Sequence, residues 1–307
     1  MYDLTIIGGG PAGCAAGVYA ARKKLTSVLI TQEFGGQSIV SEEIQNWIGT
    51  PRISGNELAK TLEKHVREYA SDIVTIVTGV RVSAISKKEG GFIVTDSSGK
   101  TYESRAVLVA SGGERRKLEV PGAAEFENKG LTYCASCDGP LFAGMDVAVV
   151  GGGNAGFETA AQLLAYAKSV TLLHRNPEFK ADPVTVEKVL AHPNMTALKN
   201  AEPSAVLGEK FVTGLRYMDK TTGEEKELAV SGVFAEIGML PSTDFVKGLV
   251  ELDEFGRIVT DPKNQHTSVP GIWAAGDCTN ELYHQNNIAA GDAVKALEDM
   301  YLFLKAR

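Results

Sequence analysis

The chain opens with a short apolar run, a glycine-rich turn and a helix-like segment, in that order. Residues Leu4–Ile7 have the length and composition of a buried strand, and Cys14–Arg22 reads as a helix. A second apolar run, Val28–Ile30, predicts another strand. Two parallel strands need a crossover connection, and the helix supplies it. The sequence therefore predicts a βαβ unit at its beginning.

The same order of elements recurs in the middle of the chain. Asp146–Val150 reads as a strand, Phe157–Tyr166 as a helix and Ser169–Leu173 as the next strand, with Gly151–Gly156 as the turn. Two βαβ units with glycine-rich turns are typical of dinucleotide binding. The predicted fold is therefore α/β, with two Rossmann-like dinucleotide-binding domains.

The segments outside the βαβ units indicate how the two domains are connected. Alternating runs at 73–78 and 91–95, a hairpin-like turn at 97–100 and a buried run at 107–110 predict further strands, and 287–304 reads as a closing helix. Glycine-rich junctions stand at 111–113 and 238–241. We therefore expect the second domain, residues 114–240, to be inserted into a first domain made of residues 1–113 and 241–307.

Composition narrows the function classes. The chain has 307 residues, 44% hydrophobic and 22% charged, which is typical of a soluble globular protein. A net charge of -7 argues against nucleic acid as the main partner. No apolar run reaches the roughly 20 residues that span a bilayer. Met1–Asp3 leads directly into a strand, so we expect no secretory signal and a cytoplasmic protein.

Both glycine-rich turns fit the pattern G-x-G-x-x-G. The first glycine makes the tight turn, the second lets a pyrophosphate approach the backbone, and the third lets the helix pack on the strand. The helix N-terminus then offers free N–H groups to the phosphate. The candidate residues are Gly8, Gly10, Pro11, Ala12 and Gly13 in the first turn, and Gly151, Gly153, Asn154, Ala155 and Gly156 in the second.

The two turns differ in the residues that come after the second strand. After Val28–Ile30 an acidic residue, Glu33, arrives late, and after Ser169–Leu173 come His174 and Arg175 with no acid. A cation at this place suits a ribose 2′-phosphate, so NADP fits the second turn better than NAD. His174 and Arg175 are candidates for binding the cofactor, with Arg175 the main one and Lys180 a possible helper, although Arg175 and Lys180 could each also be a solvated surface charge.

Cys134 and Cys137 form a C-x-x-C pair that is followed directly by Asp138. This spacing brings two sulfurs within bonding reach, and the neighbouring carboxyl could exchange a proton with a thiolate. A zinc site is the alternative, but Cys14, Cys278 and the five histidines show no matching ligand spacing. We expect no metal, and we interpret Cys14 and Cys278 as buried small side chains.

At these motifs the chain resembles the low-molecular-weight thioredoxin reductases and the related flavoprotein subunit of alkyl hydroperoxide reductase. The resemblance covers essentially the whole chain, in order. It is carried by residues 8–13, 35–37, 43–49, 110–112, 134–139, 151–156, 174–175, 238–241 and 274–277.

The resemblance implies roles for further residues. The first domain would hold FAD and the second NADPH, and Cys134, Cys137 and Asp138 would be catalytic. Residues implied at the flavin nucleotide are Gly36, Gln37, Asn46, Ala110, Gly112, Gly276, Asp277, Gln285 and Ile288. The partner would be a thioredoxin-like protein disulfide, and the chain would form a homodimer. The nicotinamide and the dithiol would need the same place beside the flavin, so we expect the inserted domain to rotate between two states.

The sequence departs from the reductase pattern after His174 and Arg175. The family usually has several arginines there, and this sequence has Asn176 in place of one and Lys180 in place of another. The segment 138–180 is closer to the hydroperoxide reductase subunit, whose additional N-terminal dithiol domain this sequence does not show. Alternatives therefore stay open: NADH or ferredoxin as the donor, a glutaredoxin-like or peroxiredoxin-linked partner, or a flavin-binding regulatory protein without turnover.

Overall fold

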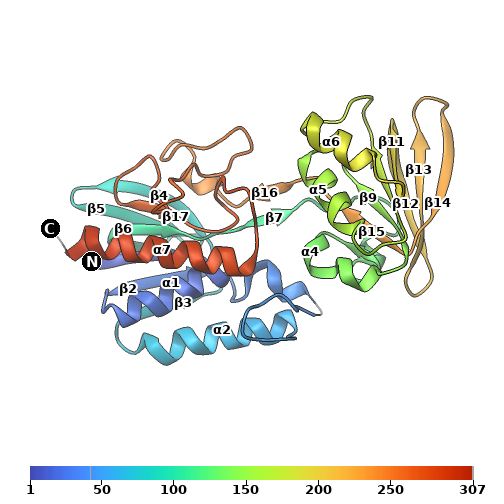
Figure 1. The fold of residues 1–307 in the computed structure, drawn as a ribbon. Coiled ribbons are helices and arrows are strands. Elements are labelled where there is room, and N and C mark those ends of the chain that lie inside the picture. The colour runs from blue at the N-terminus through green and yellow to red at the C-terminus, as the bar shows by residue number, and fades with distance from the viewer. Residues whose placement is uncertain (42, 306–307) are drawn as a thin grey trace. The chain divides into compact units, whose positions relative to one another are not determined.

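The computed structural model describes residues 1–41 and 43–305. The chain divides into two compact units, Met1–Glu114 with Leu240–Arg307, and Arg115–Met239. Short strands β7 (Gly113–Arg115) and β16 (Met239–Pro241) carry the chain across the boundary and pair with each other (Figure 1). We treat each unit by itself.

The first unit is built on a seven-stranded sheet (Figure 1). Its strands are β1 (Tyr2–Ile7), β2 (Ser27–Thr31), β3 (Val74–Thr78), β4 (Val82–Lys88), β5 (Gly91–Asp96), β6 (Thr101–Val109) and β17 (Ile272–Ala274). Its helices are α1 (Pro11–Arg22), α2 (Gly55–Ala70) and α7 (Asn286–Lys305), with 3-10 turns η1 (Gly36–Val40) and η3 (Asp244–Val246).

The parallel strands of this sheet run in the order β3-β2-β1-β6, with β17 beside the second half of β6 and the antiparallel β5 and β4 beside its first half. One face packs against α1 and α7 through small side chains such as Ala16, Ala20 and Ala293, all fully buried. The other face is covered by β4, β5 and the segment that precedes β17. Buried on both faces, β1 and β6 are strongly apolar, as parallel strands usually are.

The second unit repeats this layering. Its elements are α3 (Ala123–Phe126), β8 (Leu131–Thr132), α4 (Ala135–Asp138), η2 (Gly139–Phe142), β9 (Asp146–Val150), α5 (Asn154–Leu163), β10 (Ser169–His174), α6 (Pro183–Leu190), β11 (Met195–Lys199), β12 (Ala201–Gly208), β13 (Val212–Asp219), β14 (Glu224–Ala229) and β15 (Gly232–Ala235).

A parallel sheet in the order β11-β10-β9-β15-β8 forms the middle layer of the second unit. Alternation along β9 decides which side chain faces which layer. Val147 and Val149 pack with the helices through Phe157, whereas Ala148 and Val150 pack with the antiparallel sheet β12-β13-β14. The strand order reverses between β10 and β15 on either side of β9, the position where doubly wound folds bind nucleotides.

The α/β fold with two Rossmann-like βαβ units is confirmed, and the structure adjusts the helix boundaries. Helix α1 begins at Pro11 and α5 at Asn154, three residues before each predicted start. Proline at the first helical position is favourable because its missing N–H would have no partner there. Helix α5 ends at Leu163, before the predicted Tyr166.

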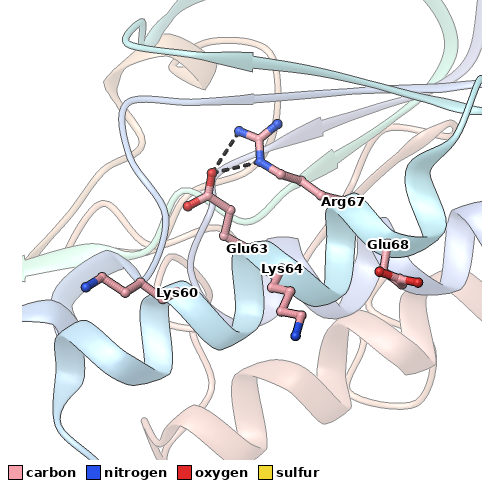
Figure 2. A pocket seen from close by; sticks show the side chains of 5 residues that line it. All are labelled: Lys60, Glu63, Lys64, Arg67 and Glu68. Carbon is pink, nitrogen blue, oxygen red and sulfur yellow. Dashed lines mark hydrogen bonds and ion pairs between the residues drawn. The ribbon is translucent and has the colours of Figure 1, made fainter.

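A hollow on the first unit runs along α2 and is lined by Lys60, Glu63, Lys64, Arg67 and Glu68 (Figure 2). Glu63 and Arg67 pair across one helical turn at 2.8 Å. All five side chains belong to the solvated face of an amphipathic helix, so we do not assign a ligand to it. Within residues 1–41 and 43–305, no helix combines the length and apolarity that crossing a bilayer requires.

Candidate active site

The first glycine turn has the geometry that its pattern predicts. Gly8 has a φ of +116°, and a Cβ there would lie 2.1 Å from the carbonyl oxygen of Ala110. A Cβ on Gly13 would lie 1.9 Å from the carbonyl oxygen of Gly8. Gly10 is different, because the nearest atom to its Cβ position is 3.9 Å away. The outer glycines serve close packing, and the middle one faces free space.

Other predicted residues of the first unit gather around this turn. Gly36 lies against Gly10, since a Cβ on Gly36 would be 3.3 Å from the Gly10 Cα. Gly276 lies between α1 and α7, where its Cβ position is 3.5 Å from the Cβ of Ala12 and 3.1 Å from that of Ala289. The end of β1, the residues after β17 and the start of α7 therefore meet at one edge of the sheet.

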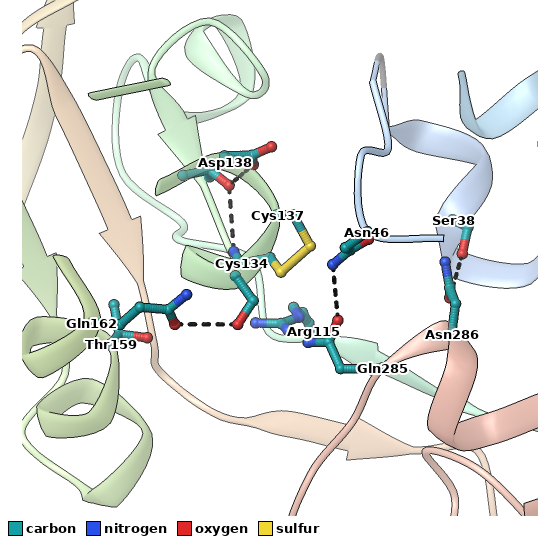
Figure 3. The surroundings of a disulfide bond; sticks show 12 residues. Ser38, Asn46, Arg115, Cys134, Cys137, Asp138, Thr159, Gln162, Gln285 and Asn286 are labelled. Carbon is teal, nitrogen blue, oxygen red and sulfur yellow. Dashed lines mark hydrogen bonds between the residues drawn. A yellow bond between two sulfur atoms is a disulfide. The ribbon is translucent and has the colours of Figure 1, made fainter. Parts of the chain in front are cut away.

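Amide side chains tie the loop after η1 to the start of α7. The Asn46 side chain donates to Gln285 at 3.1 Å, and Ser38 donates to Asn286 at 2.8 Å (Figure 3). Asn287 donates to the carbonyl oxygen of Asn46 at 2.7 Å. Ser38, Asn286 and Asn287 were not predicted.

The remaining predicted residues of the first unit have few contacts of their own. Asp277 Oδ1 lies 3.4 Å from His284 Nδ1, which has no hydrogen-bond partner among the described residues. Gln37 and Ile288 are exposed, and the space at the Cβ position of Gly112 is open to 4 Å. The side chains of Gln37 and Ile288 are therefore accessible.

The second glycine turn reproduces the first. Gly151 has a φ of +132°, with the Glu236 carbonyl oxygen 2.1 Å from its Cβ position, and a Cβ on Gly156 would lie 1.9 Å from the Gly151 carbonyl oxygen. Nothing lies within 4 Å of the Cβ position of Gly153. Ala155 is exposed, and Asn154 accepts a hydrogen bond from the Asp182 N–H at 2.8 Å.

Cations surround the end of β10. Arg175 and Lys180 are exposed, and Lys199, which ends the neighbouring strand β11, is in register with His174. His174 itself is buried against Gly152, and its Nε2 lies 2.8 Å from the carbonyl oxygen of Glu178. Burial and the three cations hold the pKa of His174 below its usual value, so it is a neutral support beneath the turn.

Cys134 and Cys137 form a disulfide, with 5.3 Å between their Cα atoms (Figure 3). Cys134 is the N-cap of the short helix α4, and the Asp138 N–H donates to its carbonyl oxygen at 3.1 Å. The Cys134 N–H donates to the Thr132 hydroxyl at 3.3 Å, and Ser136 donates to Gln162 of α5 at 3.1 Å. The dithiol turn is thus fixed to both β8 and α5.

Asp138 is partly buried beside this disulfide. The Thr132 hydroxyl donates to its Oδ2 in a short hydrogen bond. Burial raises the pKa of Asp138, while Thr132 and the charge of Arg115 oppose that rise. An aspartic acid that keeps its proton above the ordinary range is suited to protonating a thiolate.

The other two cysteines do not share this environment. Cys14 and Cys278 are buried, and burial raises the pKa of their thiols to about 12 and about 11. A thiol of so high a pKa forms little thiolate at neutral pH. In the part of the chain that the structure describes, no three His, Cys, Asp or Glu side chains are grouped to hold a metal ion.

Helix capping tests whether these turns suit a nucleotide. Helix α2 is capped by Ser54 and Glu57, and α6 by Asp182. Helices α1 and α5 have Gly10 and Gly153 as their N-cap residues and no side-chain cap. Their first N–H groups therefore remain free to bind an anion, which is the arrangement that a pyrophosphate requires. The residues present fit FAD at the first turn.

Local reading of the sequence missed Lys199, Arg115, Glu236, Thr132 and Thr159. Lys199 and Glu236 each follow an apolar run, as Arg175 does, and that pattern could have identified them. Their relation to the glycine turn depends on the order of the strands, which the sequence does not state.

Comparison with known proteins shows the family of the chain. The family model for pyridine nucleotide-disulphide oxidoreductases matches residues 2–293, and the chain belongs to this family of oxidoreductases.

The chain is 41% identical to an NADH dehydrogenase of Bacillus subtilis and 42% identical to a subunit of the alkyl hydroperoxide reductase of Pseudomonas putida. The matches cover 96% of this chain but only 57% and 56% of those proteins. The fold is similar to the thioredoxin reductase of Streptococcus pyogenes, with a TM-score of 0.91 and 34% identity over 100% of this chain and 99% of that one. For thioredoxin reductase of Giardia duodenalis the values are 0.93 and 30%, over 99% and 98%. The resemblance stated from the sequence is confirmed.

Proposed function

We propose that this chain is an FAD-dependent disulfide reductase that draws electrons from NADPH and delivers them, through Cys134 and Cys137, to the disulfide of a thioredoxin-like protein. The observation that carries the proposal is the Cys134–Cys137 disulfide, which is followed directly by the partly buried Asp138 and lies in the same unit as the second glycine turn. The thioredoxin reductases of similar fold support it.

Each group has a defined task in this proposal. FAD, when bound at the first turn, would accept hydride from the nicotinamide nucleotide and pass the electron pair to the disulfide. The free N–H groups at Gly10 and Gly153 bind the two pyrophosphates. Breaking the S–S bond with two electrons requires two protons, of which Asp138 supplies one to a departing thiolate and solvent supplies the other. The dithiol then reduces the partner by exchange, which restores the disulfide.

The cations at the end of β10 support NADPH as the donor. A 2′-phosphate would lie near Arg175, Lys180 and Lys199, whereas NADH would bring no phosphate to these cations, of which Lys199 already pairs with Glu178 at 3.2 Å. They also disfavour a donor such as ferredoxin. The homodimer follows from the resemblance alone and the cytoplasmic location from the sequence alone, and both stay predictions.

A second candidate is an NADH-dependent reductase that serves a peroxiredoxin-linked or glutaredoxin-like partner. Identities of 41% to a protein named NADH dehydrogenase and 42% to a subunit of alkyl hydroperoxide reductase favour it.

An anaerobic titration of the purified protein distinguishes the candidates. Flavin absorbance is followed while NADPH, and separately NADH, is added, and free thiols are then counted. Bleaching by NADPH at low excess, with two new thiols that a Cys137→Ser variant lacks, is the expected result. Bleaching by NADH alone would favour the second candidate. Bleaching by dithionite but by neither nucleotide would contradict both.

A further inference from the structure

Arg115 and Glu236 form an ion pair at the carboxyl edge of the sheet in the second unit. Glu236 directly follows β15, and its Oε2 lies 3.6 Å from Arg115 Nη1. The hydroxyl of Thr159, on α5, donates to the other carboxylate oxygen at 2.9 Å. The side chains of Glu236 and Arg115 are only 12% and 31% exposed, so water screens this pair less than the surface pairs of the unit.

Asp138 stands at the same edge of the sheet. Its partner Thr132 ends β8, which pairs with β15 so that Thr132 is in register with Phe234, two residues before Glu236. Arg115 and Thr159 are drawn together with the disulfide and Asp138 in Figure 3. Burial raises the pKa of both carboxyl groups, and the charge of Arg115 opposes the rise for each of them. Arg115 therefore pairs directly with Glu236 and acts on Asp138 at longer range, through its charge.

We infer that Arg115, held in place by Glu236, is a positioning residue that sets the pH range in which Asp138 carries its proton. This inference rests on the proposed function, because it assumes that Asp138 protonates a thiolate when the disulfide opens. The remaining groups that face the pair are the Thr159 hydroxyl and the carboxylate of Glu158, both on α5, and Asp138 also faces Thr132.

The two members of the pair should act on Asp138 in opposite directions. Without the Arg115 charge, the carboxylate of Asp138 loses a stabilising cation, so the proton is kept to higher pH. Without the Glu236 charge, Arg115 is no longer neutralised, so Asp138 loses its proton at lower pH. A merely structural pair would slow the reaction in both variants without moving the pH dependence.

The test uses dithiothreitol as the reductant of the purified, FAD-loaded protein, so it requires no nucleotide turnover. A dithiothreitol thiolate attacks one sulfur of the Cys134–Cys137 bond, the bond breaks, and the departing thiolate takes a proton from Asp138. The second dithiothreitol thiol then closes its ring and releases the other cysteine. Rates are measured from pH 5 to pH 9 by thiol counting. Dividing each rate by that of Asp138→Asn removes the titration of dithiothreitol itself.

In a plot of this rate ratio against pH, the expected result is a limb along which the ratio falls as the pH rises. Arg115→Met should move the limb upward by roughly one pH unit, and Glu236→Gln should move it downward. Arg115→Lys retains a cation and should keep the limb near its original position. Arg216→Met is the matched control, because Arg216 also lies between two carboxylates, Glu225 at 3.9 Å and Glu227 at 3.8 Å, but on the exposed sheet β12-β13-β14.

Two kinds of failure can be told apart. Limbs that coincide in wild type, Arg115→Met and Glu236→Gln would overturn the inference, and so would equal slowing without a shift. A ratio near one at every pH in the wild type would instead remove Asp138 from the proton step, and with it that part of the proposed function.

Discussion

The two glycine turns are nearly the same in backbone geometry and differ in the charge that surrounds them. In each turn the outer glycines pack against carbonyl oxygens and the middle glycine faces free space. At the first turn β2 ends in Thr31, whose hydroxyl donates to the Glu33 carbonyl oxygen, and no cation follows. At the second turn β10 ends beside Arg175, Lys180 and Lys199.

This difference separates the contribution of the backbone to nucleotide binding from the contribution of the side chains. The backbone turn and the free helix N–H groups recognise a pyrophosphate, which FAD and nicotinamide nucleotides share. The side chains at the end of the following strand distinguish the nucleotides. The dithiol and its acid belong only to the second unit, so in the proposed function the first unit binds FAD and the second also takes part in proton and electron transfer.

The largest expected effect comes from filling the third glycine of each turn. In Gly13→Ala and Gly156→Ala the new Cβ would lie 1.9 Å from a backbone oxygen, so the helix must shift. Gly13→Ala should purify without FAD. Gly156→Ala should stay yellow and be bleached by dithionite but not by NADPH. Flavin absorbance and its titration measure both outcomes.

Gly291→Ala is the control for this pair, because nothing lies within 4 Å of the Cβ position of Gly291, which is in helix α7. It should keep FAD and the NADPH response. Loss of FAD in Gly156→Ala, with FAD retained in Gly13→Ala, would reverse the assignment of the two turns.

The next effect concerns the acid that only the second unit carries. Asp138→Asn cannot give a proton, so disulfide reduction should slow by about 10²- to 10⁴-fold, while flavin reduction by NADPH stays within about threefold. Because burial raises the pKa of Asp138 above its ordinary value, the wild-type rate should fall as the pH rises through that pKa. Stopped-flow measurement of the two half-reactions over a pH series separates them. Equal slowing of both steps would argue against a proton role.

The sequence predicted the parts of the site that depend on neighbours along the chain. The glycine turns, the Cys134–Cys137 pair and the strands beside them are local patterns, and the structure has them where they were expected. His174 was predicted to bind the cofactor, but its ring lies buried beneath Gly152, and nothing in the dipeptide His174-Arg175 indicates which side chain points outward.

Contacts between neighbouring strands could not be predicted from local sequence patterns. Lys199 reaches the second turn because β11 pairs with β10, and Glu236 reaches it because β15 pairs with β9. Both pairings join segments far apart in sequence. The sequence analysis predicted β9 and β10 but neither β11 nor β15, and no local pattern states which strands are adjacent.

A smaller effect should come from the cations at the second turn. One charged hydrogen bond to a phosphate contributes about 1.5–3 kcal/mol, or roughly 10- to 100-fold in affinity. Arg175→Ala and Lys199→Ala should each raise the KM for NADPH by about that factor and change the KM for NADH by less than about threefold. Lys210→Ala, an exposed cation of the same unit, should change neither. Equal effects on the two nucleotides would mean that these residues do not contact the 2′-phosphate.

The smallest expected effect comes from adding a side-chain cap to α1 or α5, the helices that lack the caps found on α2 and α6. Gly153 has a φ of -96° and a ψ of -175°, which suits a serine N-cap, and its Cβ position is open. Gly153→Ser should bind the free N–H groups of α5 and raise the free energy of unfolding by a few tenths of a kcal/mol. The same hydroxyl occupies the place of the pyrophosphate, so NADPH should bind more weakly.

Gly10→Ser should likewise weaken the binding of FAD and leave the binding of NADPH unaffected. Denaturant unfolding of the FAD-free protein, with binding measured separately, gives both quantities. If Gly153→Ser gained stability and kept its affinity for NADPH, the open cap would have no role in binding the nucleotide.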